Sequence, residues 1–396
     1  MRRIITFFAA MSVCAGLSAQ THYVDSENKD MLRPFTTTGA ERTEIVLPQV
    51  NGYNVYKADL HIHTFYSDGH VSPQFRVSEA WRDGLDVIAI TDHIEYRVHD
   101  ASMAEYLDVK RHKDDKKVDF NVSMKIAQKD APAYGITVIP GTEITRDAVT
   151  VGHYNALFST DNNLVYDEDP MVAIKNAKAQ GALVMHNHPG WRHKDMVPSE
   201  FEQKVYAAGL IDGIEIMNTD EFYPQAIDRA LEHGFFMSSN TDVHGATSDD
   251  YLSRGYYRNM TFILAKENTL EALRDALEQR RTLAYSYGMI AGEESLLKDF
   301  FNASVSCRVL QNNDNGSKRV ALTNNSSLSY YLRFGDANPV VLEPFTTMRF
   351  TTDKEGKLEF VVENMWMSEK GHPTIKIDTA PQAGSARWLS IEYETL

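Results

Sequence analysis

Lys57-Ala58-Asp59-Leu60-His61-Ile62-His63 is the stretch of sequence that decides the fold. Apolar and polar residues alternate along it, which predicts a half-buried β-strand. Side chains two residues apart in a strand point to one face, so His61 and His63 share a face. Asp59 has the same phase and could orient one of the two imidazoles. A turn follows, and it places Asp68 just past the carboxyl end of the strand.

Similar residues recur near the ends of later predicted strands. These strands cover 87–90, 137–140, 153–158, 182–185, 213–217 and 235–239, and they alternate with predicted helices at 73–83, 122–133, 170–180, 226–232 and 269–280. The alternation predicts a parallel sheet, most simply a βα barrel, whose active site lies at the carboxyl ends of the strands. The candidate residues at those ends are His93, Glu143, His153, His186, His188, Asp242 and His244. Such a crowd of imidazoles and carboxylates would be costly to bury without cations.

The rhythm changes near residue 303. Short alternating runs follow, separated by turns such as 312–316, and they predict a small all-β domain of the sandwich type. The runs are 319–323, 329–334, 347–351, 357–362, 374–377 and 388–393. We therefore expect an N-terminal extension at 20–50, a barrel at 51–284, a connection at 285–302 and a β domain at 303–396.

The N-terminus predicts export. Met1-Arg2-Arg3 is followed by an apolar run to about Leu17 and then by small residues, which is typical of a signal peptide covering 1–19. The run is too short to span a bilayer, and no later stretch reaches that length. Cleavage would take the formal charge from −15 to −17 and leave Cys307 as the single cysteine. We expect a protein secreted across the inner membrane into a bacterial periplasm.

Five motifs together resemble the PHP (polymerase and histidinol phosphatase) family. They are Asp59-Leu60-His61-Ile62-His63-Thr64 with Ser67-Asp68-Gly69, Ile90-Thr91-Asp92-His93, Gly141-Thr142-Glu143, His188-Pro189-Gly190 and Asp242-Val243-His244. The resemblance covers about residues 56–284. It implies a distorted (βα)7-type barrel that holds up to three divalent metal ions and hydrolyses phosphoesters. Segments 92–96, 143–146 and 152–158 further resemble an exported bacterial branch with a C-terminal β domain, some of whose members resemble small-molecule phosphodiesterases.

The resemblance also implies which residues bind metal. A first ion would be held by His61, His63, Glu143 and Asp242, and Glu143 would bridge to a second ion held by His153 and His188. Asp68, His93 and His244 would hold a third. The family's histidine directly precedes proline, so His188 is the expected ligand and His186 a neighbouring pocket residue. Mixed nitrogen and oxygen ligands suit Zn, Mn and Fe alike, so two or three divalent ions of open identity are expected.

The expected reaction is attack on phosphorus by a metal-bridging hydroxide. Two ions joined by Glu143 would lower the pKa of a shared water and neutralise charge on the phosphate. The leaving group could take its proton from His186 or from Asp242.

The loop after His188 offers candidate substrate contacts. Arg192 could grip a phosphate and Trp191 could form an apolar wall, although a solvated basic loop is an equally good interpretation. Arg146 is a further candidate cation.

Net charge argues for a small substrate. A chain with 55 acidic and 40 basic residues lacks the basic footprint that long nucleic acid requires. We expect a small phosphate diester or monoester as the partner. One alternative is an amidohydrolase-type enzyme that cleaves amides or lactones, although a two-metal site would leave Asp68, His93 and His244 without a role. A non-catalytic metal-binding protein is the other, and the oligomeric state is open.

Overall fold

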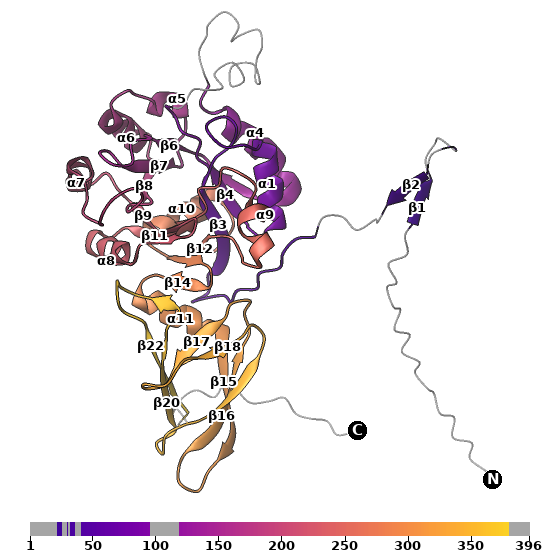
Figure 1. Ribbon diagram of the computed structural model, residues 1–396. Helices are drawn as coiled ribbons and strands as arrows, with labels where there is room; N and C mark the ends of the chain where they lie inside the picture. The colour runs from indigo at the N-terminus through magenta and orange to yellow at the C-terminus, as the bar shows by residue number, and fades with distance from the viewer. Residues whose placement is uncertain (1–21, 26–29, 31, 36–40, 96–118, 380–396) are drawn as a thin grey trace, which may run out of the picture. The chain divides into compact units, whose positions relative to one another are not determined.

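The computed structural model describes residues 22–25, 30, 32–35, 41–95 and 119–379 (Figure 1). The chain forms two compact units, 1–41 and 42–396. In the first unit, strands β1 (His22–Asp25) and β2 (Leu32–Phe35) pair antiparallel. The expected signal peptide at 1–19 and the expected strand at 388–393 lie outside the described residues. The rest of the fold belongs to the second unit.

Two mixed sheets form the first part of this unit. One has the strand order β21 (Met365–Trp366), β14 (Met289–Ala291), β13 (Thr282–Ser286), β12 (Met260–Ala265), β3 (Asn54–Ile62), β4 (Val87–Ile90) and β5 (Thr137–Ile139). The other has the order β10 (Glu221–Phe222), β9 (Gly213–Asn218), β8 (Leu183–Asn187), β7 (His153–Leu157) and β6 (Gly141–Ile144), and β11 (Phe236–Asn240) pairs with β9.

Strand directions explain how the sheets differ from the expected barrel. β3, β4 and β5 are parallel, as are β8, β9 and β11, but β7 runs antiparallel to both of its neighbours. Two isolated bridges, Ile62 with Val243 and His93 with Glu143, join the two sheets. The predicted mixed α/β architecture is confirmed. The strands do not form one continuous parallel barrel, because β7 pairs antiparallel with β6 and β8, and β12 pairs antiparallel with β3.

Helices follow the strands at the predicted places. They are α1 (Pro73–Arg82), α4 (Val122–Asp130) with the 3-10 turn η1 (Ala131–Tyr134), α6 (Pro170–Ala179), α8 (Pro224–His233) and α10 (Leu270–Glu278). The first begins with proline after Ser72, whose side chain accepts a hydrogen bond from the backbone of Phe75. None of the helices among the described residues has both the length and the apolar character needed to cross a membrane.

Several shorter elements have no counterpart in the expected pattern. Helix α7 (Glu200–Ala207) begins with a capping box in which the side chains of Ser199 and Glu202 satisfy each other's backbone N–H groups. The remaining pieces are α5 (Asn162–Val165), α9 (Thr247–Asp250) and the 3-10 turn η2 (Leu252–Arg254). Both α9 and η2 lie in the loop that follows β11, close to Asp242 in sequence.

The segment expected to connect the two regions, 285–302, contains regular structure. β13 and β14 form a hairpin whose two turn residues, Tyr287 and Gly288, have φ of 47° and 82°. Positive φ at both positions is the conformation of a type I′ turn, which suits the twist of a hairpin. Helix α11 (Glu294–Ser304) follows.

The chain after α11 is β-rich, as predicted, and contains two antiparallel sheets (Figure 1). One is formed by β15 (Val305–Asn312), β16 (Lys318–Asn324) and β19 (Thr347–Thr351). The other is formed by β18 (Val340–Leu342), β17 (Tyr330–Arg333), β20 (Lys357–Val362) and β22 (Thr374–Asp378). One hydrophobic cluster extends from Ile62 of β3 to Phe360 of β20, so the β-rich region packs on the same core.

Candidate metal centre

The structure brings all nine expected ligands together beside the two bridges that join the sheets. Their ligand atoms form five groups of three, and within each group the atoms lie within 4.8 Å of one another. The nine residues are His61, His63, Asp68, His93, Glu143, His153, His188, Asp242 and His244. None of the groups found among the described residues includes a side chain of the β-rich region.

Glu143 lies at the centre of this cluster, and its two oxygens face different imidazoles. Oε1 lies 3.2 Å from His153 Nδ1 and 3.9 Å from His188 Nε2. Oε2 lies 3.1–3.3 Å from the nearest ring nitrogens of three histidines, which are His61, His63 and His93. One buried carboxylate is therefore positioned to contribute an oxygen to two different ions.

Two further carboxylates flank Glu143. Asp242 Oδ1 lies 3.2 Å from His61 Nε2 and 3.0 Å from His63 Nε2, and its Oδ2 lies 3.7 Å from His188 Nε2. On the other side, Asp68 contacts His244 Nε2 at 3.2 Å, His93 Nε2 at 3.5 Å and His63 Nδ1 at 3.5 Å. His63 thus lies between the two aspartates.

The spacing of these atoms fits divalent ions. Ligand atoms about 2.0–2.1 Å from a common ion lie roughly 3 Å from one another. His61 Nε2 and His63 Nε2 are 3.1 Å apart, a separation at which two imidazole nitrogens need a shared proton or cation between them. Glu143 Oε2 and His93 Nδ1 are buried and have no hydrogen-bond partner among the described residues. These candidate ligand atoms therefore have lone pairs that are free to bind a metal ion within the cluster.

The pKa values of the cluster histidines also show that the buried carboxylates favour positive charge nearby. Burial acts to lower the pKa of His63, but Asp242 and Glu143 outweigh it and raise that pKa to about 10. By contrast, burial dominates at His188 and lowers its pKa to about 3. Without an ion, His63 therefore carries a proton at neutral pH. Metal binding must displace that proton, so metal affinity rises with pH.

Glu215, which the sequence pattern does not single out, orients His61. It is fully buried on β9, and its Oε1 lies 3.0 Å from His61 Nδ1. The same carboxylate accepts hydrogen bonds from the His188 backbone at 2.7 Å and from the amides of Asn218 and Asn240. A proton held on Nδ1 by Glu215 leaves the Nε2 lone pair of His61 free for a metal ion.

Substituting Glu215→Gln should weaken metal binding by about 10–100-fold, the usual effect of losing a carboxylate that orients a histidine ligand. Glutamine can present either oxygen or nitrogen to Nδ1, so the imidazole no longer has one fixed tautomer. Calorimetric titration of the metal-free variant with a divalent metal ion measures the change in affinity. Unchanged affinity would show that His61 is oriented by other contacts.

Asp59 has a different role from the expected one. It pairs with the buried Arg258 at 2.6 Å and with the Thr241 hydroxyl at 2.5 Å, and it accepts a hydrogen bond from the backbone of His61 rather than from its ring. Asp92 similarly secures the turn that carries Asp68, because it accepts hydrogen bonds from Thr64 and Ser67. These carboxylates fix the loops and not the imidazole rings.

Arg76 of α1 connects the two loops that carry ligands. It is fully buried, and its five N–H groups match five acceptors within 2.7–2.9 Å. One acceptor is Glu79, and the other four are the backbone carbonyls of His63, Val243, His244 and Gly245. A single guanidinium therefore fixes the backbone beside His63 and on both sides of His244.

Backbone conformation at two ligands is unusual. His188 and Asp242 have φ of 25° and 51°, a region that residues other than glycine rarely adopt. Such strain is concentrated at functional sites, where surrounding contacts stabilise it. At His188 this conformation also ends the alternation of side chains along β8, so the side chains of His186 and His188 lie in different surroundings.

His186 lies outside the cluster. Its Nδ1 is 2.6 Å from the Tyr206 hydroxyl, and its Nε2 is 3.0 Å from Glu202, both on α7. Its two nitrogens therefore face α7 rather than the cluster, which argues against the expected role in leaving-group protonation. Glu95, which the sequence analysis did not consider, lies closer: its Oε1 is 3.9 Å from His93 Nδ1, and burial raises its pKa to about 7.

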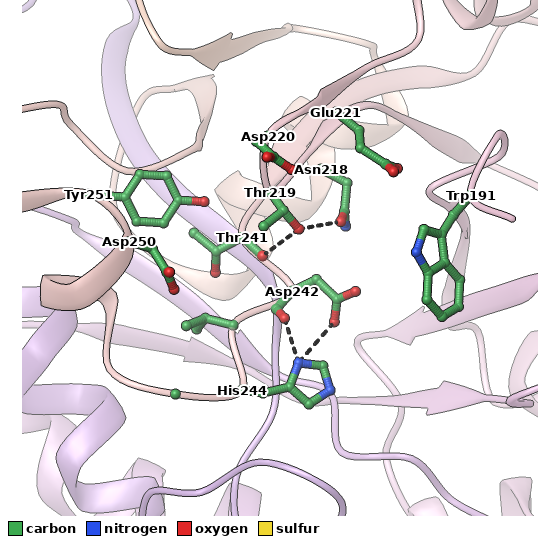
Figure 2. A pocket seen from close by; sticks show the side chains of 12 residues that line it. Trp191, Asn218, Thr219, Asp220, Glu221, Thr241, Asp242, His244, Asp250 and Tyr251 are labelled. Atoms are coloured by element: carbon green, nitrogen blue, oxygen red, sulfur yellow. Dashed lines mark hydrogen bonds and ion pairs between the residues drawn. The ribbon is translucent and has the colours of Figure 1, made fainter. Parts of the chain in front are cut away.

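The three expected substrate-binding residues lie at the rim of the cluster. The Trp191 ring contacts those of His153 and His188, with centroids 5.7 and 5.2 Å apart. Arg192 is exposed and stacks on Trp191 at 4.2 Å, whereas Arg146 donates a hydrogen bond to Asp68 at 3.0 Å. A cavity of about 410 Å³ opens beside Trp191, Asp242 and His244 (Figure 2).

Comparisons with known proteins agree with this geometry. The family model described as PHP domain matches residues 59–193. A two-domain protein from Bacteroides vulgatus, containing a predicted PHP-like metal-dependent phosphoesterase, is 33% identical, with 86% of this chain and 99% of that chain covered and a TM-score of 0.77. A protein from Bifidobacterium adolescentis assigned as a metal-dependent phosphoesterase is 16% identical (56% and 96% covered), and its TM-score of 0.38 carries no weight. No curated protein matches the chain.

Proposed function

The chain belongs to the PHP family, and on that premise we propose that it is a metal-dependent phosphoesterase that hydrolyses small phosphate diesters or monoesters. The observation that carries the proposal is the arrangement around Glu143, where five imidazoles surround one buried carboxylate. Nine ligands exceed the four that a single tetrahedral ion takes, so we propose two or three ions.

Each part of the cluster has a distinct task in this proposal. Divalent ions bound there would lower the pKa of a bound water and neutralise charge on the phosphate. Glu143, whose two oxygens face different imidazoles, would help to hold two ions. Asp242 lines both the cluster and the cavity, which makes it the better candidate than His186 to pass a proton to the leaving oxygen. Glu95, protonated in part near neutral pH, is a second proton source.

Hydrolysis should depend on metal and should be confined to phosphate esters. We expect chelated protein to lose turnover of 4-nitrophenyl phosphate and bis(4-nitrophenyl) phosphate, and Mn²⁺ or Zn²⁺ to restore it. Elemental analysis of active protein should give more than one ion per chain. A single tightly bound ion in fully active protein, with no gain on added metal, would refute the proposed cluster.

The same assay separates the alternative functions. Cleavage of nitrophenyl amides or of lactones at comparable rates would favour an amidohydrolase, and metal binding without any turnover would favour a non-catalytic protein. A long oligonucleotide serves as the control for substrate size, because a protein that binds a phosphate backbone needs a run of cationic side chains along a groove. Processive digestion of it at the rate of the small esters would contradict a small-substrate site.

A further inference from the structure

The cavity beside the cluster has walls of unusual chemistry. Three loops that follow β8, β9 and β11 form it (Figure 2), so it shares Asp242 and His244 with the candidate metal centre. Beyond these two residues, its polar lining includes three carboxylates, those of Asp220, Glu221 and Asp250. No lysine or arginine among the described residues lines it. A second phosphate or a carboxylate on the substrate would be repelled here.

The carboxylates are available to a ligand. Asp220 and Asp250 are exposed, and neither side chain forms an ion pair or hydrogen bond with the described residues. Glu221 accepts a hydrogen bond from the Tyr223 hydroxyl, which leaves its other oxygen free. Three acceptor groups therefore surround a space of about 410 Å³, which lies at the small end of ligand-pocket volumes.

Tyr251 supplies an independent sign that something binds here. Its side chain is 1% exposed, and its hydroxyl is buried without a hydrogen-bond partner among the described residues. Figure 2 shows that hydroxyl directed from the wall toward the cavity, on the side of Thr241. A buried hydroxyl without a partner destabilises the protein, and a bound polar group would remove that cost.

The Asn218 amide donates to Glu215, and the single proton of the Thr219 hydroxyl is directed to Asn218 at 2.8 Å, with the Thr241 carbonyl at 3.3 Å. The Tyr251 hydroxyl remains available and can accept as well as donate a hydrogen bond, while four carboxylates line the same cavity. The cavity therefore presents mainly acceptors. An alkylammonium group has three donors and no acceptor, so it complements this lining better than a hydroxyl, which needs both. Trp191 adds an aromatic wall, which is favourable for a cation.

We propose that this cavity is a subsite for a positively charged ammonium group on the organic part of the phosphate ester. The substrate class is a small zwitterionic ester in which a short aminoalkyl chain links the ammonium to an ester oxygen of the phosphate. The inference rests on the proposed function, because it assumes that the phosphate binds at the metal centre. It assigns specificity to Asp220 and Asp250, which sequence reasoning did not identify.

Binding of non-hydrolysable phosphonates to the full metal-loaded chain tests the subsite. By calorimetry, 2-aminoethylphosphonate should bind about tenfold more tightly than the isosteric propylphosphonate, the combined effect of two partly exposed ion pairs of a few-fold each. The ratio should fall toward one at high salt and in the Asp220→Asn, Asp250→Asn double variant. Glu267→Gln, which removes an exposed acid from the loop after β12, is the matched control and should keep the ratio.

The outcomes separate the subsite from the function. Equal binding of the two phosphonates, or no binding of 2-aminoethylphosphonate to protein that hydrolyses nitrophenyl phosphate, would overturn the subsite alone. Preference for 2-hydroxyethylphosphonate over both would also overturn it and would assign a hydroxylated substituent. Loss of turnover with every phosphate ester would instead count against the proposed function. Melting temperatures establish whether the variants are folded. The ratio of the two phosphonate affinities in the unsubstituted chain tests the subsite without any variant.

Discussion

Glu143→Gln is expected to lower kcat/KM for nitrophenyl phosphate esters by roughly 10³-fold, because metal ions supply several kcal/mol of transition-state stabilisation. The carboxylate contacts imidazoles through both oxygens, so its loss affects two ion positions together. An amide keeps the size of the side chain but removes its negative charge and one acceptor. Elemental analysis should show that most of the bound metal is lost with the activity.

Two control variants make that result specific. Glu267→Gln makes the same chemical change at an exposed position. His372→Ala removes an imidazole of the β-rich region that hydrogen-bonds to the Met365 carbonyl and packs on Trp366. Both should keep their metal content, although His372→Ala forfeits one hydrogen bond. Full activity in folded Glu143→Gln would rule out a bridging role for this carboxylate.

The ligands could be predicted from sequence because each belongs to a short motif at a strand end. His61 and His63 follow the alternation of side chains along β3, and Glu143 and Asp242 lie at strand ends as predicted. His153 reaches the same cluster from the start of β7, which runs antiparallel to β6. Parity failed where the chain leaves the regular strand conformation. At His188 the backbone turns to a φ of 25°, so His186 two residues earlier packs against α7 instead.

The residues that support the ligands were harder to predict. Glu215 lies within the apolar run Gly213-Ile214-Glu215-Ile216, and a charge in such a buried strand is a signal that was available. Arg76 carries no comparable signal, because an arginine on a helix is ordinarily exposed. Its role depends on acceptors more than 160 residues away in the chain.

The organisation after β12 was only partly predictable. The β-rich character of the C-terminal region follows from alternating runs, but the pattern gave no sign that 285–302 would form a hairpin and a helix. Pairing of β14 with β21 depends on a strand about 75 residues later, information that no local window contains.

Arg76→Met is expected to destabilise the fold by about 3–5 kcal/mol, the cost of leaving a buried charge without its partner. The group left behind would be Glu79, which is 1% exposed, contacts Arg76 at 2.8 Å and would keep only Arg82, at 3.9 Å, as a cationic neighbour. Four backbone carbonyls beside His63 and His244 would also lose their donor. Urea unfolding measures the stability, and metal titration should show binding weakened by about 10–100-fold.

A double substitution separates the two effects of Arg76. Arg76→Met with Glu79→Gln removes the orphaned charge while keeping an acceptor for the backbone of Thr247, so much of the stability should return. Metal affinity should stay low, because glutamine cannot reach the carbonyls that hold the ligand loops. Arg76→Lys should have the same low metal affinity as the methionine variant, since an ammonium has three donors and Arg76 satisfies five acceptors. Recovery of full metal affinity in the stabilised double variant would mean that Arg76 supports the fold alone and does not position His63 and His244.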